Sequence, residues 1–399
     1  MLARCVGVSG AEFAAEYWSR RPLLSPAAHS AQDFTDLLDL NAIDELLSRR
    51  GLRTPFIRMA KQGKVIAPRA FTRSGGQGAG IADQVADDKV MTLLADGATL
   101  VLQALHRTWP PLVEFGTRLA VELGHPVQIN SYLTPPQNQG FAAHFDTHDV
   151  FVLQVSGRKR WVIHRPVLPD PLPEQTWETV RAEVERRVEE PAVLDVMLQP
   201  GDALYLPRGY LHSAVAQAET SLHLTVGVHP VTRYALLEHL LTAARSHPEL
   251  RRSLPLDPQL ATEAALAEPL AETLLALQQF VAGEHLRPLA VRVSDQLAGA
   301  IRPGPLAPLA QLELAAHLDP HTPVRLRPGL QPRLDAAGAR LRLHTLGEAA
   351  EFDAATEPAL RLLLSGQTVP AGGLPGLDDE AGVDLVRQLL VTGVLVAGG

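Results

Sequence analysis

Three side chains that can bind one metal ion stand in two separate stretches of the sequence. His144 and Asp146 lie two residues apart in AHFDTHD, and His212 follows a Pro-Arg-Gly turn in LPRGYLH. Residues two apart on a β-strand point to the same face, so His144 and Asp146 can bind the same ion. His212 comes 66 residues after Asp146. It completes the set only if the fold brings the two stretches together.

The residue types restrict the identity of the metal. Two imidazoles and one carboxylate on one side of an ion are the ligands of non-haem Fe(II) oxygenases, and they leave other coordination positions open for chemistry. Zinc hydrolysis is the competing interpretation of the same residue types. It is disfavoured because the sequence lacks a helical H-E-x-x-H grouping and places no obvious general base in the motif. We therefore predict Fe(II).

The stretches around these ligands resemble a known family. HFDTHDVFVLQVSGRKRWVIH, followed by PGDALYLPRGYLHSA and SLHLTV, is similar to the JmjC oxygenases of the ribosomal-oxygenase group, which includes the bacterial ROXA-type enzymes. The resemblance runs from about Glu12 to about Pro230. It implies a cupin-type jelly roll, Fe(II), and the co-substrates 2-oxoglutarate and O₂. It also implies hydroxylation of an Arg or His side chain in a ribosomal protein.

The far carboxylate of 2-oxoglutarate needs a cation inside such a site. Lys159 is the candidate, because it is one of only four lysines in a chain that otherwise uses arginine. The resembled enzymes place a basic residue at the same distance from their His-x-Asp pair. The resemblance also assigns Asn130, Ser221 and His223 to the co-substrate or metal site, and Tyr132 shares the strand face of Asn130. An ordinary structural position is the alternative for Asn130, Ser221 and His223.

His148 needs a separate interpretation. It has the same strand parity as His144 and Asp146, so it can point to the same side. Three consecutive ligands on one face would over-fill the site. We therefore interpret His148 as a substrate-side or structural residue.

The β-rich middle of the chain predicts the scaffold. Seven short strand-like runs, bounded by Gly and Pro, follow one another at close spacing, which is typical of a barrel or a double-sheet jelly roll. The runs are VQINSYLT, HDVFVLQV, KRWVIH, AVLDVML, DALYLP, HSAVA and SLHLTVGV. Helices precede them, one opened by a Ser9–Glu12 capping box and one over 112–123. The prediction is an α+β catalytic domain over 1–230 with its core at 95–230.

The rest of the chain has a different pattern. Residues 231–302 are helical, and the resemblance implies a dimerisation region there. Residues 309–399 are predicted to form a winged-helix-like domain after a Pro-rich linker. From residue 321 to the end there are nine Asp or Glu against seven Arg and no Lys, so DNA binding is not expected. The glycine-rich segment 74–80 lacks a nucleotide-binding fingerprint and is predicted to be a surface loop.

Composition sets further bounds. The net charge of −8 disfavours a general nucleic-acid or membrane-surface binder, although it suits a basic protein partner. A single cysteine excludes an internal disulfide and favours the cytoplasm. No signal peptide or membrane span is predicted.

Three alternatives to a ribosomal hydroxylase stay open: the same chemistry on a biosynthetic peptide or small metabolite, N-methyl-lysine demethylation, and a non-enzymatic interaction protein whose metal site is idle.

Overall fold

The computed structural model describes residues 1–29, 33–78, 80–282, 286–346 and 348–398. It divides the chain into two compact units, residues 1–230 and 231–399. Residue 79 of the predicted loop and residues 283–285 of the predicted helical region lie outside the described residues. Among the described residues, no helix combines the length and apolar character needed to span a bilayer. The proposed three-domain division stays a prediction.

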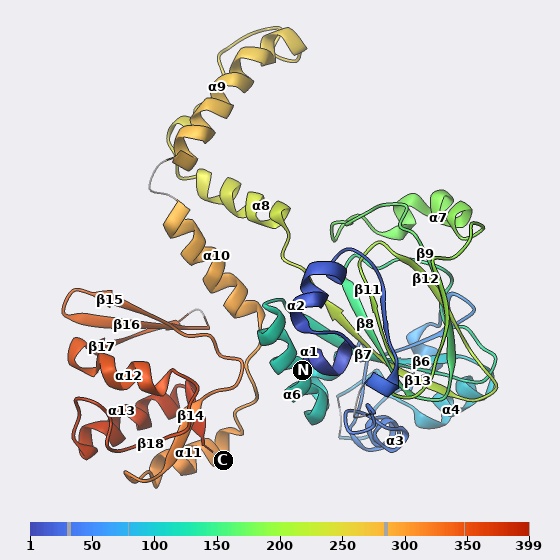
Figure 1. The fold of residues 1–399 in the computed structure, drawn as a ribbon, viewed down its shortest axis with the longest axis horizontal. Helices are drawn as coiled ribbons and strands as arrows, with labels where there is room; N and C mark the ends of the chain where they lie inside the picture. The colour runs from blue at the N-terminus through green and yellow to red at the C-terminus, as the bar shows by residue number, and fades with distance from the viewer. Residues whose placement is uncertain (30–32, 79, 283–285, 347, 399) are drawn as a thin grey trace. The chain divides into compact units, whose positions relative to one another are not determined.

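Two antiparallel sheets form the scaffold of the first unit. The larger has the strand order β1-β11-β8-β13-β7-β6-β2-β3 and the smaller the order β10-β9-β12. Figure 1 shows β9 and β12 facing β8 and β11 across the domain, which confirms the predicted double-stranded β-helix. The bounds of the larger sheet are β1 (Leu23–Ser25), β2 (Ile57–Lys61), β3 (Lys64–Val65), β6 (Thr99–Leu102), β7 (Val127–Thr134), β8 (Asp149–Ser156), β11 (Ala203–Leu206) and β13 (Ser221–Val228). Those of the smaller are β9 (Lys159–His164), β10 (Leu194–Leu198) and β12 (Leu211–Ala216).

Strand β8 is buried on both faces, because each of its faces packs against a different layer. Phe151, Leu153 and Val155 belong to the main core under the N-terminal helices. Val150 and Val152 point the other way and pack with side chains of the smaller sheet. This explains why β8 is an unbroken apolar run rather than an alternating one. The inner face that begins at Val150 is the one that continues toward the predicted metal ligands.

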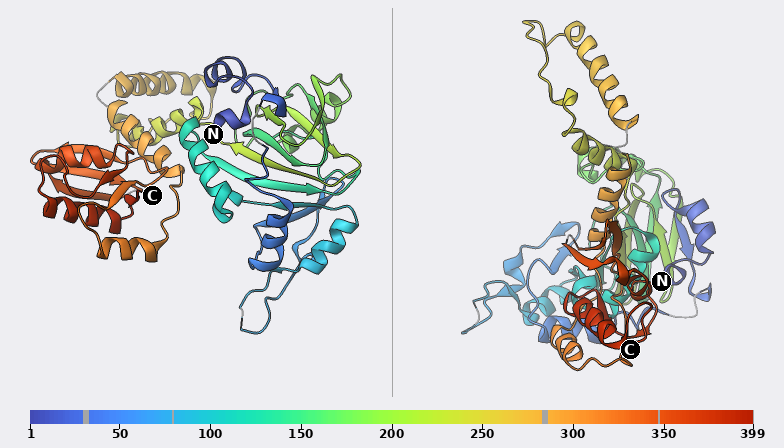
Figure 2. Two further views of the ribbon diagram at one scale, coloured as in Figure 1. Left: turned by 60° about the horizontal axis from the view of Figure 1, so that its bottom comes forward. Right: turned by 90° about the vertical axis from the view of Figure 1, so that its left-hand side faces the viewer.

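Helices close the outer face of the larger sheet. They are α1 (Leu2–Cys5), α2 (Gly10–Glu12), α3 (Leu40–Arg49), α4 (Asp87–Ala95), α5 (Leu105–Thr108) and α6 (Pro110–Leu123). The predicted N-cap is present, since the Glu12 amide donates to Ser9 Oγ at 3.1 Å. Figures 1 and 2 place α3 and α4 near one another, on the side of the domain where β6 lies.

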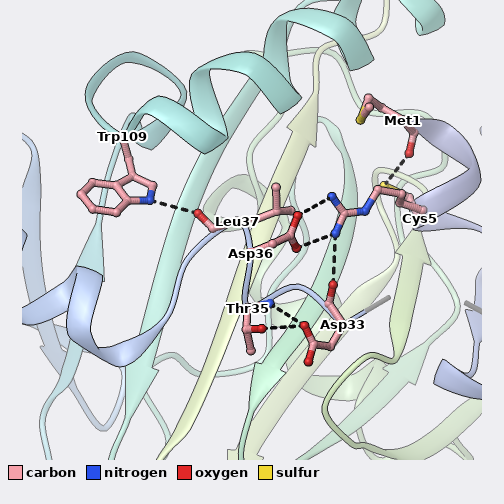
Figure 3. A network of polar contacts seen from close by, with 8 residues as sticks. Met1, Cys5, Asp33, Thr35, Asp36, Leu37 and Trp109 are labelled. Atoms are coloured by element: carbon pink, nitrogen blue, oxygen red, sulfur yellow. Dashed lines mark hydrogen bonds and ion pairs between the residues drawn. The ribbon is translucent and has the colours of Figure 1, made fainter. Parts of the chain in front are cut away.

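A polar network holds the N-terminal segment in place. The Arg4 guanidinium donates to both carboxylate oxygens of Asp36, at 3.0 and 2.7 Å, and to the Asp33 carbonyl at 3.1 Å. Trp109, just before α6, donates its indole N–H to the Leu37 carbonyl at 3.0 Å (Figure 3). These contacts join residues far apart in the sequence, so the N-terminal segment is part of the scaffold.

One short helix of the first unit has no counterpart in the prediction. A 3₁₀ turn, η4 (Trp177–Val180), leads into α7 (Arg181–Arg187), and both lie between β9 and β10. Val184 of α7 is buried together with Phe145 and Leu211. Because Phe145 stands between His144 and Asp146, this helix packs directly against the segment that carries the metal ligands.

The second unit is mainly helical at its start and mixed at its end. Its helices are α8 (Arg233–Ala244), α9 (Glu263–Ala282), α10 (Leu286–Ala300), α11 (Pro308–Ala316), α12 (Glu357–Leu363) and α13 (Asp379–Val391). Two three-stranded sheets follow, one of β14 (Pro323–Leu326), β18 (Val369–Pro370) and β19 (Leu395–Ala397), the other of β15 (Arg333–Ala337), β16 (Arg340–Thr345) and β17 (Glu348–Asp353). Helices α11, α12 and α13 share one core with strands of both sheets, and the winged-helix-like domain over 309–399 stays a prediction.

Candidate metal and co-substrate site

The fold brings the three predicted metal ligands together. The ligand atoms of His144, Asp146 and His212 all lie within 4.8 Å of one another, a spacing that can hold one metal ion. His212 Nε2 and Asp146 Oδ2 are 3.7 Å apart. His144 and His212 exchange two backbone hydrogen bonds, of 3.2 and 2.8 Å, as an antiparallel bridge. This bridge joins the approach to β8 with the start of β12, so the site connects the two sheets.

Backbone carbonyls orient both imidazoles. The Nδ1 atom of His144 lies 2.8 Å from the Ala142 carbonyl, and that of His212 lies 3.2 Å from the Tyr210 carbonyl. A carbonyl only accepts hydrogen bonds, so each Nδ1 carries a proton, and Nε2 is the ring nitrogen left to bind a metal. Burial and the neighbouring His144 lower the pKa of His212 to about 4. Neutral imidazoles with free Nε2 atoms are the form that binds metals.

A tight turn delivers His212 to the site. Gly209 has a φ of +84°, and a side chain there would meet the Leu168 carbonyl oxygen at 2.6 Å. Its amide donates to the Asp146 carbonyl at 3.0 Å. The turn therefore needs glycine for two reasons, and it ties the segment before His212 to the backbone of a second ligand.

A buried carboxylate next to the ligands braces this turn. Asp149 is fully buried and accepts hydrogen bonds from the Tyr205 hydroxyl at 2.6 Å, the Arg208 amide at 2.9 Å and the Ser19 hydroxyl at 3.2 Å. Burial and the Asp149 charge raise the pKa of Tyr205 far above its ordinary value, so the phenol stays a donor. Asp149 thus connects the first residue of β8 with the turn before His212.

An Asp149→Ala variant is expected to lose both stability and metal affinity. Its buried partners would be left unpaired, which lowers the free energy of unfolding by about 3–5 kcal/mol. The loosened turn should weaken Co(II) binding by roughly 10-fold or more. Urea unfolding and a Co(II) titration measure the two effects. Asp195→Ala is the control, because Asp195 forms an exposed ion pair with Arg160; equal behaviour of the two variants would contradict the role of Asp149.

The ligands line a cavity of about 720 Å³. Lys159 also lines it and is only 4% exposed. Its ammonium group donates to Thr134 Oγ1 at 3.0 Å. Within the described ranges no carboxylate acts on the charge of Lys159. Burial without a counter-ion lowers the pKa of Lys159 to about 7, so the structure supplies a cation that an anionic ligand would stabilise.

Aromatic side chains form one wall of the cavity. Tyr132 on β7 and His223 on β13 are cross-strand partners, and their rings stack with centroids 5.0 Å apart. Trp161 meets His223 edge-on at 5.4 Å and lies 5.9 Å from the His212 ring. Burial lowers the pKa of His223 well below its ordinary value. This wall is therefore neutral and stiff, which suits the positioning of a ligand.

The remaining predicted residues differ in their placement. Asn130 lines the cavity, while its Oδ1 accepts a hydrogen bond from the Ala104 amide at 3.1 Å. Ser221 is not brought to the cavity wall: it is fully buried and accepts a hydrogen bond from Gln154 Nε2 at 2.9 Å. It does pair with Thr134, the residue that contacts the Lys159 ammonium. Ser221 therefore belongs to the layer of residues behind Thr134 and the Lys159 ammonium, and not to the cavity wall.

His148 lines the cavity but stands apart from the three ligands. Its ring stacks on His229 with centroids 5.0 Å apart, and its Nε2 lies 3.5 Å from Gln128 Nε2. It is absent from the group whose atoms can share one ion among the described residues. This placement agrees with a substrate-side or structural role.

Sequence reasoning missed several residues that line the cavity. Trp177, Glu178 and Arg181 reach it from η4 and α7, and Arg58 reaches it from β2. A signal for the helix exists, because Trp177, Val180, Val184 and Val188 recur at helical spacing. The signal for Arg58 is weaker: it is a charged residue between the buried Ile57 and Met59, and so points to the opposite face of its strand.

Comparison with known proteins agrees with this architecture. The JmjC domain family matches residues 115–236. The chain is 32% identical over 262 residues to the bifunctional lysine-specific demethylase and histidyl-hydroxylase NO66 of Aedes aegypti, covering 62% of this chain and 38% of that protein. It is 37% identical over 173 residues to ribosomal oxygenase 1 of Rattus norvegicus, covering 42% and 28%. The chain thus spans less than two fifths of the length of these relatives.

Solved structures share the fold over nearly the whole chain. The crystal structure of Escherichia coli ycfD matches with a TM-score of 0.56 and 18% identity, covering 98% of each chain. A structure of the same protein, called a ribosomal oxygenase and solved with cobalt and 2-oxoglutarate, matches with a TM-score of 0.54 and 17% identity, covering 99% of each chain. Residues 115–236 thus match the JmjC domain family, and the chain is similar over part of its length to proteins named as a histidyl-hydroxylase and as a ribosomal oxygenase.

Proposed function

We propose that this protein is an Fe(II)- and 2-oxoglutarate-dependent hydroxylase that modifies an Arg or His side chain of a ribosomal protein. One observation carries the proposal: His144, Asp146 and His212 form a facial ligand set in a cavity that also contains the buried Lys159, which has no counter-ion among the described residues. A cation without a counter-ion beside an incomplete ligand set is the arrangement that a chelating dianion requires. The solved ycfD structure with cobalt and 2-oxoglutarate supports the same assignment.

The donor set fits Fe(II). Burial raises the pKa of Asp146, but the neighbouring His148, His212 and His144 outweigh it and hold that pKa below its ordinary value, so the carboxylate is charged. One carboxylate and two imidazole nitrogens suit a borderline metal, and the open cavity side leaves room for exogenous ligands. Bound Fe(II) would supply the activation of O₂ at this place. His144, Asp146 and His212 would hold it, and the backbone carbonyls behind the imidazoles would fix their orientation.

The cavity side chains would position the co-substrate and exclude water. Lys159 would bind the far carboxylate of 2-oxoglutarate, and Thr134 holds the ammonium in place. Tyr132, His223 and Asn130 would form the wall against which the co-substrate lies. No side-chain general base is required for this chemistry. The work of the residues is to orient groups and to keep the cavity dry until the substrate arrives.

The choice of substrate follows from the relatives and from charge. The names of the relatives combine histidyl hydroxylation, lysine demethylation and ribosomal oxygenation, so demethylation is retained as the second candidate. A net charge of −8 favours a basic protein partner. We place the protein in the cytoplasm with its ribosomal target and propose no role in DNA binding.

Intact-mass spectrometry of ribosomal proteins tests the proposal. Ribosomal subunits from cells that lack the gene are incubated with the protein, Fe(II), 2-oxoglutarate and air. A gain of one oxygen on one protein, absent with His144→Ala, is expected. Succinate formation without any gain would redirect the search to peptides, small metabolites or methylated lysines. Absence of both products would support an idle site.

We further propose that the helical region of the second unit mediates a homodimer. Large apolar side chains are exposed there, with Leu270 and Leu274 of α9 each 59% exposed. They stand four residues apart and so share a face of the helix. Leu237 and Leu241 of α8 repeat the pattern at 53% and 57%. Such faces are typical of helix–helix interfaces.

A double substitution tests the dimer. Light scattering should give twice the chain mass for the wild type and one chain mass for a Leu270→Glu, Leu274→Glu variant, because two buried charges oppose association. Leu256→Glu is the control, since Leu256 is fully exposed outside the helices. A monomeric wild type, or a double variant that still dimerises, would refute this interface.

A further inference from the structure

We propose that Arg58 is a substrate-binding residue that receives an oxygen acceptor, a carboxylate or a main-chain carbonyl, of the polypeptide next to the residue that is modified. The inference rests on the proposed function and adds a specificity-determining contact to it. Arg58 lies on β2 and lines the same cavity as the metal ligands. Its Nε is buried and has no hydrogen-bond partner in the part of the chain that the structure describes.

The contacts of Arg58 hold it in place and leave its donors available. The guanidinium carbon lies 5.7 Å from the centre of the Phe141 ring. Its guanidinium also lies near the phenol of Tyr132, where it partly offsets the rise in the pKa of that phenol, as does Thr225. Both contacts are to neutral groups. Among the described residues, the buried Nε–H of Arg58 has no hydrogen-bond partner, so this N–H can donate to a bound substrate.

The charges of 2-oxoglutarate can be neutralised without Arg58. 2-Oxoglutarate carries two carboxylates: one chelates the metal together with the keto oxygen, and the far one would pair with Lys159. Both negative charges are then matched without Arg58. The two cations also come from different sheets, since Lys159 begins β9 of the smaller sheet and Arg58 lies in the larger. Arg58 is therefore available to the second ligand of the cavity, which is the substrate.

The position of Arg58 fits a group close to the reacting side chain. The phenol that it contacts is near enough to the Asp146 carboxylate for that charge to help raise the pKa of Tyr132, after burial, to about 12. Only the Tyr132 side chain thus separates Arg58 from the metal ligand Asp146. A polypeptide that presents a side chain to the metal brings its own carbonyls, or a neighbouring acidic side chain, to this distance.

The test separates substrate from co-substrate with two matched variants. The full-length protein is loaded with Co(II) and 2-oxoglutarate and applied to an array of peptides that tile the ribosomal proteins of its own organism. Arg58→Met keeps the side-chain stem and removes the charge, and Arg58→Lys restores a charge. Co-substrate affinity is measured in parallel from the quenching of tryptophan fluorescence, which also shows that each variant is folded.

The two substitutions are expected to affect different ligands: Arg58→Met the peptide, and Lys159→Met the co-substrate. Arg58→Met should weaken capture of the wild-type peptides by about 10- to 100-fold, the range of a charge-assisted hydrogen bond, with 2-oxoglutarate affinity within about 2-fold. Arg58→Lys should recover part of the capture, and Lys159→Met should show the reverse pattern. Replacing Asp and Glu of a captured peptide by Asn and Gln then identifies the acceptor: binding is lost for a carboxylate and kept for a carbonyl.

Three outcomes would overturn the inference: capture unchanged in Arg58→Met, co-substrate affinity reduced in that variant, or no peptide captured by the wild type. Failure of the proposed function is scored separately by the mass-spectrometric assay. Oxygen gain that is insensitive to Arg58→Met leaves the function and removes the inference. Peptide capture that depends on Arg58 but gives no oxygen gain would keep the inference and remove the proposed hydroxylase function.

Discussion

A His144→Ala variant is expected to lose metal binding and all turnover of 2-oxoglutarate. His144 supplies one of three ligands, and its Nε2 is the donor that the Ala142 carbonyl orients. Two remaining ligands hold a divalent ion poorly, so Co(II) affinity should fall by at least about 100-fold. Succinate formation should fall to the level without protein. Isothermal titration with Co(II) and a succinate assay measure the two losses.

His148→Ala is the matched control. His148 lies four residues later, has the same strand parity and lines the same cavity, but it stacks on His229 instead of joining the ligand group. Its removal should leave Co(II) affinity within about threefold. If His148→Ala costs as much metal affinity as His144→Ala, the ligand set is wrong. A His144→Ala protein that still turns over 2-oxoglutarate would refute the site itself.

Much of the scaffold could be predicted because local signals agree with the tertiary fold. The run VQINSYLT corresponds residue for residue to β7 (Val127–Thr134). Gly124 ends α6 in the left-handed conformation, as a glycine after an apolar helix predicts. In such segments the pattern that favours the element also buries it, so sequence and packing give the same answer.

The metal ligands could be predicted because their spacing carries the geometry. The His144–Asp146 pair needs only strand parity, and the Pro-Arg-Gly turn marks the arrival of His212. Ser221 was assigned to the co-substrate site by the resemblance and not by parity, and that assignment stays a prediction. The register between β13 and β8 shifts at Leu222 and His223, and Gln154 binds the Ser221 hydroxyl. An irregularity in pairing is set by the neighbouring strand and cannot be seen in one strand alone.

The missed cavity residues depend on tertiary packing. Arg58 reaches the metal cavity because β2 pairs with β6, and β6 with β7, which carries Tyr132. No local sequence pattern predicts that β2, β6 and β7 lie side by side in this order. The helix α7 is short and exposed on most of its surface, and it acquires its place only by covering Phe145 and Leu211. Residues that arrive through such long-range pairings need the structure to be found.

The second large effect is expected from Lys159→Met, which should raise the KM for 2-oxoglutarate by about 100-fold or more. The far carboxylate would then be buried without a counter-ion, which costs about 3–5 kcal/mol. Metal affinity should be unchanged, because Lys159 is not a ligand. Lys64→Met is the matched control: Lys64 also lines the cavity but is exposed. A similar KM in both variants would remove Lys159 from the co-substrate site.

The pH dependence of binding tests the same residue in the wild type. The anion pairs with the ammonium form, and burial lowers the pKa of Lys159 to about 7 in the free protein. Affinity for 2-oxoglutarate should therefore be constant below pH 7 and fall by up to about tenfold for each pH unit above it, since a proton must be taken up on binding. Fluorescence titrations from pH 6 to 9 measure this slope, and Lys159→Met should abolish it.

The lowered pKa of Lys159 also predicts that Lys159→Met stabilises the ligand-free protein, although the same substitution weakens co-substrate binding. The Lys159 ammonium has an ordinary pKa of 10.5 in the unfolded chain and about 7 in the fold, so the unfolded state binds more protons between these values. Stability should rise with pH across that window. Below pH 7, burying the charge costs on the order of 5 kcal/mol. Lys159→Met should therefore raise the Tm of the ligand-free protein, while adding 2-oxoglutarate to the Co(II)-loaded protein should raise the Tm further in the wild type and not in the variant. A lower Tm in the variant would show that Lys159 is a structural residue, and the co-substrate assignment would then need another cation.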